Sequence, residues 1–124
     1  RPYVDFAPLM LLSQQSLASI ASAAPDSKID VRRFRPSIFV DTPSDEAFPE
    51  QGWLGKRLRI GEVVLDLRMT CPRCVMTTHG FADLAKDPTV MRTLVKQAEG
   101  NLGVYATVTE TGTIRVGDVL EVID

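Results

Sequence analysis

The sequence predicts a mostly β domain, in which a barrel-like core of short strands is accompanied by two or so peripheral α-helices. Several short segments that are apolar or alternate with period two are separated by glycines, a pattern typical of antiparallel strands joined by turns. Only two segments have the periodicity of a helix. The 124 residues, 44% of them hydrophobic, suffice for one core, so residues 1–124 are predicted to form a single domain.

Two helices are predicted, over residues 14–23 and 88–99. Ser13 is a favourable N-cap for the first helix, and Pro25 follows its end. Gly100 is placed to cap the C-terminus of the second. The apolar stripe of this second helix, which we expect to face the core, consists of Val90, Met91, Leu94 and Val95.

Extended segments account for most of the remaining chain, and they are predicted over residues 30–41, 57–60, 62–70, 103–109 and 119–123. Gly61 separates the second from the third and predicts a turn or bulge there. The third segment alternates apolar and mixed side chains and delivers Cys71 at its end. Residues 42–52 are rich in proline and acidic residues and predict a loop, with Trp53 anchoring its end.

Arginines gather in the extended segment 30–41. Its alternation places Arg35 and Ser37 on the same side, as a shared ligand-facing surface requires. The net charge is 14 minus 16, or -2, and no basic run is long enough for nucleic acid. The cluster of Arg32, Arg33 and Arg35 is therefore better explained by a small anionic ligand.

The composition predicts a cytoplasmic protein without a membrane partner. No stretch approaches the roughly 20 apolar residues that cross a bilayer, and no signal-peptide pattern opens the sequence. The chain has two cysteines, which suit a reducing compartment as free thiols, whereas a disulfide scaffold would need more of them.

The two cysteines form a C-x-x-C pair, Cys71 and Cys74, whose spacing fits several uses. With the lone His79 they are one ligand short of a closed zinc site unless Asp83 or a partner chain completes it. A dithiol redox pair wants a helix N-terminus, but the following residues are β-branched. A disulfide across so small a loop would stabilise little. Two partly buried core thiols are the remaining reading.

Three motifs in order give the pair a context: RFRPSI at residues 33–38, CPRCVMTT at 71–78 and GTIRVGD at 112–118. Further matching segments are PLMLLS at 8–13, GWLGKRL at 52–58 and LGVY at 102–105. Together these motifs resemble the MOSC domain, the family named for the C-terminal domain of molybdenum cofactor sulfurase. The family includes the amidoxime-reducing enzymes. The resemblance covers nearly the whole chain and implies the MOSC β-barrel-like fold.

The resemblance also implies a cofactor site. In molybdenum-binding members the second cysteine of the segment that matches CPRC at residues 71–74 gives its thiolate to the metal, and Cys74 is that cysteine here. The residues that match the rest of the cofactor pocket are Arg35, Ser37, Arg73, Thr77, Tyr105 and Ser13. The expected cofactor is molybdenum bound to molybdopterin. The hydroxyl residues also have ordinary readings, since Ser13 can be an N-cap, Thr77 a strand threonine and Tyr105 a half-buried tyrosine.

The function implied is an oxidoreductase that reduces N-hydroxylated or N-oxide compounds. Its partners would be a small-molecule substrate and an electron-donor protein of flavin or iron-sulfur type. The sequence departs from well-studied relatives over residues 79–88, where they have an acidic turn, and His79 there is either an acid-base group or a solvated loop residue. The alternative is a sulfur carrier, in which Cys74 holds a persulfide received from a pyridoxal-phosphate desulfurase.

The family domain normally carries further strands before the first one expected here. The resemblance therefore implies a fold shortened at its N-terminus, with part of the cofactor pocket missing. An open sheet edge would follow, and such an edge has to be covered. We accordingly expect a homodimer that pairs through this edge.

Overall fold

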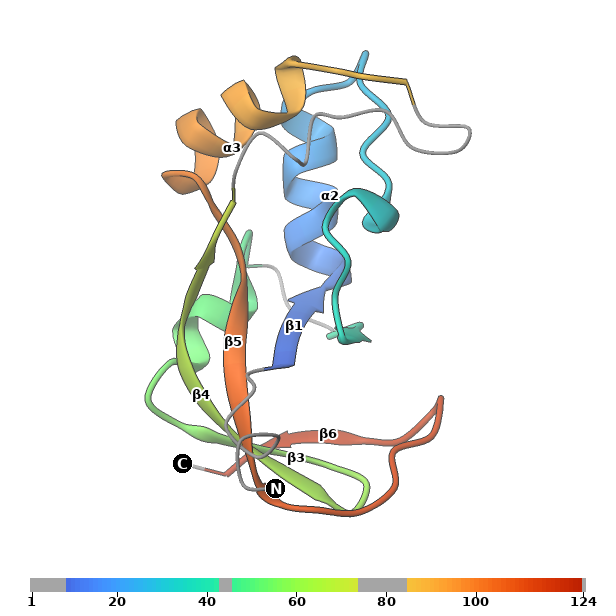
Figure 1. The fold of residues 1–124 in the computed structure, drawn as a ribbon, viewed down its shortest axis with the longest axis vertical. Coiled ribbons are helices and arrows are strands. Elements are labelled where there is room, and N and C mark those ends of the chain that lie inside the picture. Colours follow the sequence, from blue (N-terminus) through green and yellow to red (C-terminus); the bar gives the residue numbers. More distant parts are fainter. Residues whose placement is uncertain (1–8, 43–45, 74–84, 124) are drawn as a thin grey trace, which may run out of the picture.

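A computed structural model describes residues 9–42, 46–73 and 85–123 of the chain (Figure 1). Within them the strands are β1 (Leu9–Ser13), β2 (Ile38–Val40), β3 (Arg57–Ile60), β4 (Val63–Pro72), β5 (Asn101–Glu110) and β6 (Leu120–Val122). The helices are α2 (Gln14–Ala23), α3 (Thr89–Ala98) and the 3-10 helices η1 (Val31–Arg33) and η2 (Pro49–Trp53). The predicted class, mostly β with two α-helices, is confirmed.

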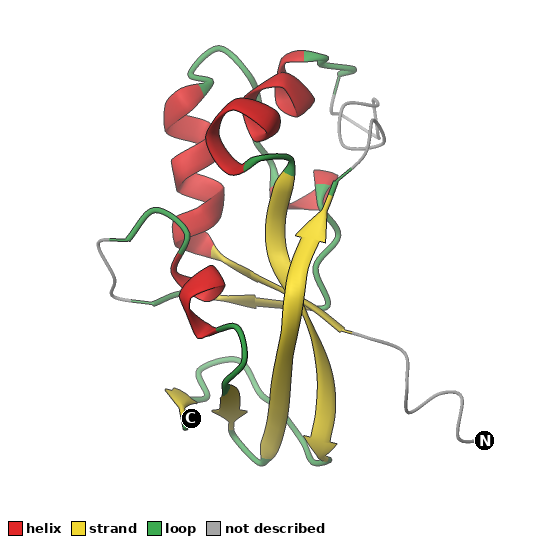
Figure 2. Cartoon of the chain, turned by 90° about the vertical axis from the view of Figure 1, so that its left-hand side faces the viewer, coloured by secondary structure: helices red, strands yellow, loops and turns green. Residues whose placement is uncertain are grey.

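The described strands form one curled sheet in the order β2-β1-β5-β4-β3-β6. The β1–β2 pair is parallel and the other pairs are antiparallel. The two α-helices lie at one end of the long β4–β5 pair, and β3 and β6 lie at the other (Figures 1 and 2). In the described part of the chain β2 and β6 are the edge strands, so the sheet curls like half of a barrel without closing. Pairing through an open edge stays a prediction.

Each face of the sheet has its own apolar cluster. The helix-side cluster joins both α-helices to β1, β4 and β5 through Met10, Leu12, Leu17, Ile20, Phe34, Cys71, Val90, Leu94 and Leu102. The second cluster fills the concave side with Leu11, Leu58, Ile60, Val63, Leu65, Leu67, Val104 and Ala106. Strand β1 serves both clusters because successive side chains of a strand point to opposite faces.

Strand β4 changes faces before it reaches Cys71. Leu67 and Cys71 are four residues apart and would share a face in a regular strand. Leu67 nevertheless packs in the concave cluster, while Cys71 packs in the helix-side cluster. A shift of register relative to β5, between Leu67 and Met69, inserts one extra residue there. This bulge turns the end of β4 and its buried thiol toward the helices.

Most predicted elements are confirmed. Helices α2 and α3 have the predicted places, with Ser13 as the N-cap of α2, and Gly61 forms the β3–β4 turn at a φ of 55°. The predicted stripe of α3 is wrong at one position, because Val95 is 56% exposed and Thr93 is buried in its place. Thr93 satisfies its hydroxyl by donating to the carbonyl of Thr89 at 2.8 Å.

Two irregular segments differ from prediction. Residues 31–35 are not extended, since Asp30 caps the 3-10 helix η1 and Arg35 then takes a positive φ of 53°. The predicted loop 42–52 ends in η2, which contains the fully buried Glu50. The strand β1 had no predicted counterpart. No helix in the described ranges is long and apolar enough to cross a membrane.

Candidate functional site

The predicted site residues fall into two groups. The structure describes Ser13, Arg35, Ser37, Arg73 and Tyr105. Cys74 and Thr77 lie outside the described residues, as do His79 and Asp83 of the zinc reading. The site is therefore built from the segments that lead into Cys74 and from those packed beside them.

Arg73 directly precedes Cys74 and is held by three other segments. Its Nε donates to the Leu102 carbonyl at 3.0 Å, and its NH1 donates to the Phe34 carbonyl at 2.9 Å. Its NH2 lies 3.2 Å from Sδ of Met10, and the guanidinium sits 5.5 Å from the centre of the Phe34 ring. Its backbone N–H donates to the Gly100 carbonyl at 2.8 Å. The last described residue before Cys74 is thus fixed by β1, β5 and the turn after η1.

Gly103 makes room for this guanidinium. It has a φ of +83°, a conformation that favours glycine. A Cβ there would lie 2.6 Å from Met10 Sδ, 3.0 Å from the Leu11 carbonyl and 3.4 Å from NH2 of Arg73. The close approach of β5 to β1 and to Arg73 therefore requires glycine at this position.

Arg35 combines a strained backbone with an unengaged side chain. Its φ of 53° is in the left-handed region, which costs a non-glycine residue about 1 kcal/mol. Its side chain is exposed and has no hydrogen-bond or ion-pair partner among the residues that the structure describes. Strained residues of this kind concentrate at functional sites, where the surrounding structure holds them in place. Arg35 is accordingly an exposed guanidinium that is available to an external anion.

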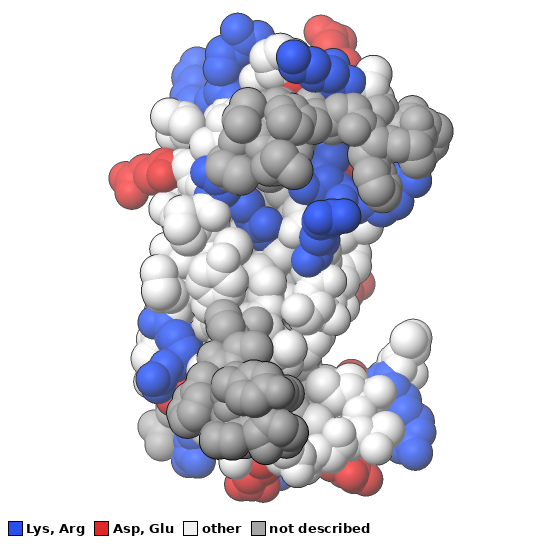
Figure 3. Space-filling model, viewed as in Figure 1, with Lys and Arg blue, Asp and Glu red and all other residues white. Residues whose placement is uncertain are grey.

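The other two arginines of the predicted cluster are engaged. Arg32 donates through Nε and NH2 to the carboxylate of Asp30 at 3.1 and 2.9 Å, and this contact lowers the pKa of Asp30 to about 2. Arg33 is buried and donates to the carbonyls of Lys28 and Ala85, both at 2.8 Å. The expectation that the three form one anion-binding group is therefore corrected. On the face shown in Figure 3, Lys and Arg side chains lie in the half that holds the helices and also at the opposite end.

Arg35 and Ser37 do not share a surface. The turn at Arg35 breaks the period-two pattern, so Arg35 lines a shallow depression with Val31, Arg32, Pro36 and Phe39. Ser37 instead lines a separate cavity, and its backbone is tied to β1. The N–H of Ser37 donates to the Met10 carbonyl at 2.8 Å, and its Oγ accepts from the Met10 N–H at 3.2 Å.

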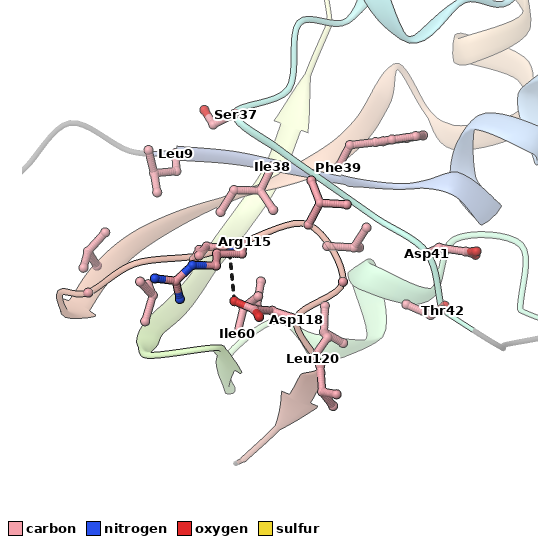
Figure 4. A pocket seen from close by; sticks show the side chains of 18 of the residues that line it. Leu9, Ser37, Ile38, Phe39, Asp41, Thr42, Ile60, Arg115, Asp118 and Leu120 are labelled. Carbon is pink, nitrogen blue, oxygen red and sulfur yellow. Dashed lines mark hydrogen bonds between the residues drawn. The ribbon is translucent and has the colours of Figure 1, made fainter.

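The cavity beside Ser37 lies between the two edges of the sheet. It measures about 1120 Å³ and is bordered by β2, β6 and the segment 111–119 (Figure 4). Its wall is mostly apolar, including Ile38, Val40, Ile60 and Leu120. The one hydrogen bond drawn in it joins the Arg115 N–H to Oδ2 of Asp118 at 2.8 Å. The cavity thus occupies the gap between the edge strands β2 and β6 of the described sheet.

Cys71 and Tyr105 form the inner part of the site. Cys71 is buried at the end of β4, and Tyr105 on β5 is half-buried beside it. A hydrogen bond with the Cys71 side chain, together with the electrostatic influence of that thiol and burial, raises the pKa of the Tyr105 phenol. The nearby Arg73 guanidinium opposes this shift. Tyr105 is therefore a protonated hydrogen-bond donor near neutral pH.

The titration of Tyr105 provides a test of this contact. We expect the phenol of Tyr105 to ionise above its ordinary pKa, and Cys71→Ala to move the midpoint back down. Because the folded-state pKa is raised, the contact stabilises the fold below pH ~10 and loses that effect as pH rises through the folded-state pKa. Phenolate absorbance in a Tyr3→Phe background, where Tyr105 is the remaining tyrosine, measures the midpoint. An unchanged midpoint in Cys71→Ala would contradict the assignment.

Ser13 has a structural role in α2. Its Oγ accepts from the Ser16 N–H at 3.0 Å and donates to Oε1 of Glu50 at 2.7 Å. Glu50 also accepts from the Ser13 N–H at 2.9 Å and the Ser16 hydroxyl at 2.6 Å. Both serines and the carboxylate are buried. Ser13 is thus the N-cap of α2, as predicted. Glu50 is a buried acceptor of three hydrogen bonds that the sequence analysis did not identify.

One described side chain is suited to an anionic ligand. Residues 9–42, 46–73 and 85–123 contain no group of three His, Cys, Asp or Glu side chains that could hold a metal. A guanidinium such as that of Arg35 matches phosphate geometry, and the chain next to it leads directly into a cysteine. Among the described residues, the Arg35 guanidinium therefore fits an anionic group.

Comparisons with known proteins bear on this site. The sequence model of a family described as the MOSC domain matches residues 2–121. The mitochondrial amidoxime reducing component 2 of Bos taurus is 33% identical over 94% of this chain, and the mitochondrial amidoxime-reducing component 1 of Danio rerio is 39% identical over 94%. This chain covers 37% of each of these relatives.

A solved structure is similar in fold. The crystal structure of a hypothetical protein superimposes with a TM-score of 0.68 at 14% sequence identity, covering 94% of this chain and 51% of that chain. At this identity the likeness concerns the fold alone. It supports the curled sheet with helices at one end as an arrangement found in another protein.

Proposed function

This chain belongs to the MOSC domain family, and from that premise we propose that it binds a molybdenum cofactor through Cys74 and is part of an enzyme that reduces N-hydroxylated or N-oxide compounds. The support for the substrate class is the likeness to amidoxime-reducing components. The support for an anionic cofactor is Arg35, whose strained backbone presents a guanidinium without a described partner. This last observation carries the proposal at the level of the structure.

The roles of the residues follow from their contacts. The Cys74 thiolate would ligate the metal, because a soft sulfur ligand suits a metal that already carries dithiolene sulfurs. Arg35 would pair with the anionic part of the cofactor. Tyr105, whose phenol is held beside Cys71, would line the pocket. When bound, the cofactor supplies two electrons, which with two protons convert an N–OH group to N–H and water.

This chain covers 37% of the length of each relative named above. A small N-oxygenated substrate and a flavin or iron-sulfur electron donor are our proposals for its partners. The relatives named above are mitochondrial by name, and the cytoplasmic location of this chain stays a prediction. The sulfur-carrier alternative also stays a prediction, with no relative named above to favour it over the reductase.

The decisive experiment is the molybdenum and pterin content of the chain and of Cys74→Ser, both expressed in a host that makes the cofactor. We expect metal in the parent and its loss in Cys74→Ser, because the thiolate is the proposed protein ligand. Cys71→Ser is the matched control. Cys71 is buried and hydrogen-bonded to Tyr105, and serine keeps a polar group at that place, so this variant should keep the metal.

Two results would count against the proposal. Full molybdenum occupancy in Cys74→Ser would exclude this thiolate as the ligand. A parent without molybdenum, but with a reductant-sensitive mass increase of one sulfur, about 32 Da, that Cys74→Ser lacks, would favour the sulfur carrier instead.

A further inference from the structure

Arg35 can present its guanidinium only if the turn around it is held in a strained form. A left-handed non-glycine residue persists only where its neighbours over-determine the conformation. Its own N–H makes a bond of 3.3 Å to the Val31 carbonyl, at the long end of the usual range. Something outside the turn must therefore contribute to holding it.

Two outside contacts bracket Arg35. On one side, the Phe34 carbonyl, which belongs to the same peptide group as the Arg35 N–H, accepts from NH1 of Arg73 at 2.9 Å. On the other side, Ser37 is tied to Met10 of β1 by two hydrogen bonds. Arg73 also covers the Phe34 ring. The Phe34–Arg35 peptide thus has its orientation set by a residue 38 positions later in the sequence, next to the proposed metal ligand.

From these contacts we propose that Arg73 is a positioning residue, which locks the Phe34–Arg35 peptide and so aims the Arg35 guanidinium at the anion. The inference rests on the proposed function and deepens it. Direct binding of the cofactor by Arg73, which the resemblance implies, stays a prediction. The described contacts reach each of the three guanidinium nitrogens of Arg73, through the carbonyls of Leu102 and Phe34 and the sulfur of Met10.

The geometry requires an arginine rather than a lysine. Nε bonds β5 while NH1 bonds the turn before Arg35, so one rigid plane connects both segments. A lysine ammonium is a single point at the end of a flexible stem and cannot hold both carbonyls at this spacing. Gly103 supplies the matching space on β5, because any Cβ there would crowd Met10 and Arg73. The link between β5 and the turn at Arg35 therefore requires both the arginine at position 73 and the glycine at position 103.

A double-mutant cycle with inorganic phosphate as the probe tests the proposal. Arg35→Ala, Arg73→Lys and the double variant are titrated with phosphate and followed by NMR, with Arg92→Lys, an exposed arginine on α3, as control. Loss of Arg35 should weaken binding about tenfold or more. Arg73→Lys should reproduce much of that loss, and the double variant should bind no more weakly than Arg35→Ala, because both changes act through one guanidinium. A further loss in the double variant would make Arg73 a direct ligand and overturn the proposal.

Amide hydrogen exchange provides the second readout. In Arg73→Lys, exchange at Arg35 and Ser37 should accelerate about tenfold while the amides of α3 stay unchanged, since only the turn is released. Unchanged exchange at these two amides would overturn the positioning role. Absence of saturable phosphate binding in the parent would count against the proposed anion site, and the exchange data would still decide the role of Arg73.

Discussion

Replacing Glu50 with alanine should lower the free energy of unfolding by about 3–5 kcal/mol, because two hydroxyls and one N–H in the core lose their hydrogen-bond acceptor. Glu50 is fully buried, and its carboxylate lies at the N-terminus of α2. That helix has no acidic residue in its first turn, and Glu50 instead supplies acceptor oxygens to the groups at its N-terminus. Urea unfolding at constant m-value measures the loss.

A graded series identifies the cause. Glu50→Gln keeps an acceptor for both hydroxyls at the Oε1 position, but it turns an NH2 group toward the Ser13 N–H. We therefore expect a smaller loss of about 1–2 kcal/mol. Glu121→Ala, an exposed glutamate on β6, should change stability by less than about 0.5 kcal/mol. Equal losses in Glu50→Gln and Glu50→Ala would contradict the hydrogen-bond account.

This buried centre shows why part of the site could not be predicted. A capping box is recognised because its partners are three residues apart, but Glu50 reaches Ser13 across 37 positions. The segment around Glu50 is rich in proline and acidic residues, which correctly indicates irregular structure and gives no sign of burial. The helix and its Ser13 cap were predictable because their signals are local.

The same distinction holds at the proposed cofactor site. The β3–β4 turn at Gly61 and the strand that ends near Cys71 follow from local alternation and a glycine. The face of the sheet on which Cys71 lies cannot be predicted from local sequence, because it depends on a bulge that forms only when β4 pairs with β5. Within the predicted extended segment 30–41, residues 38–40 do form a strand, but residues 31–35 do not. Alternation predicts a strand there as well, whereas the Asp30 cap and the left-handed Arg35 close a 3-10 turn. The family motifs identify Arg35 as a site residue, but they give no sign of its left-handed backbone conformation.

The backbone of Arg35 leads to a prediction in which stability and binding change in opposite directions. Arg35→Gly should raise the free energy of unfolding by about 0.5–1 kcal/mol, because glycine takes a φ of 53° without steric cost. The same change removes the guanidinium, so molybdenum content in a cofactor-making host should fall about tenfold or more. Thermal unfolding and metal analysis on the same preparation measure both effects.

Two variants separate strain from charge in this experiment. Arg35→Ala removes the guanidinium but keeps a side chain in the left-handed region, so it should lose molybdenum without gaining stability. Glu99 is the matched control, since it is the other described non-glycine residue with a positive φ, at 54°, and it ends α3 away from the Arg35 turn. Glu99→Gly should gain similar stability and keep its molybdenum. If Arg35→Gly kept its molybdenum as well, the anion would be held by other side chains and the left-handed turn would have a purely structural origin.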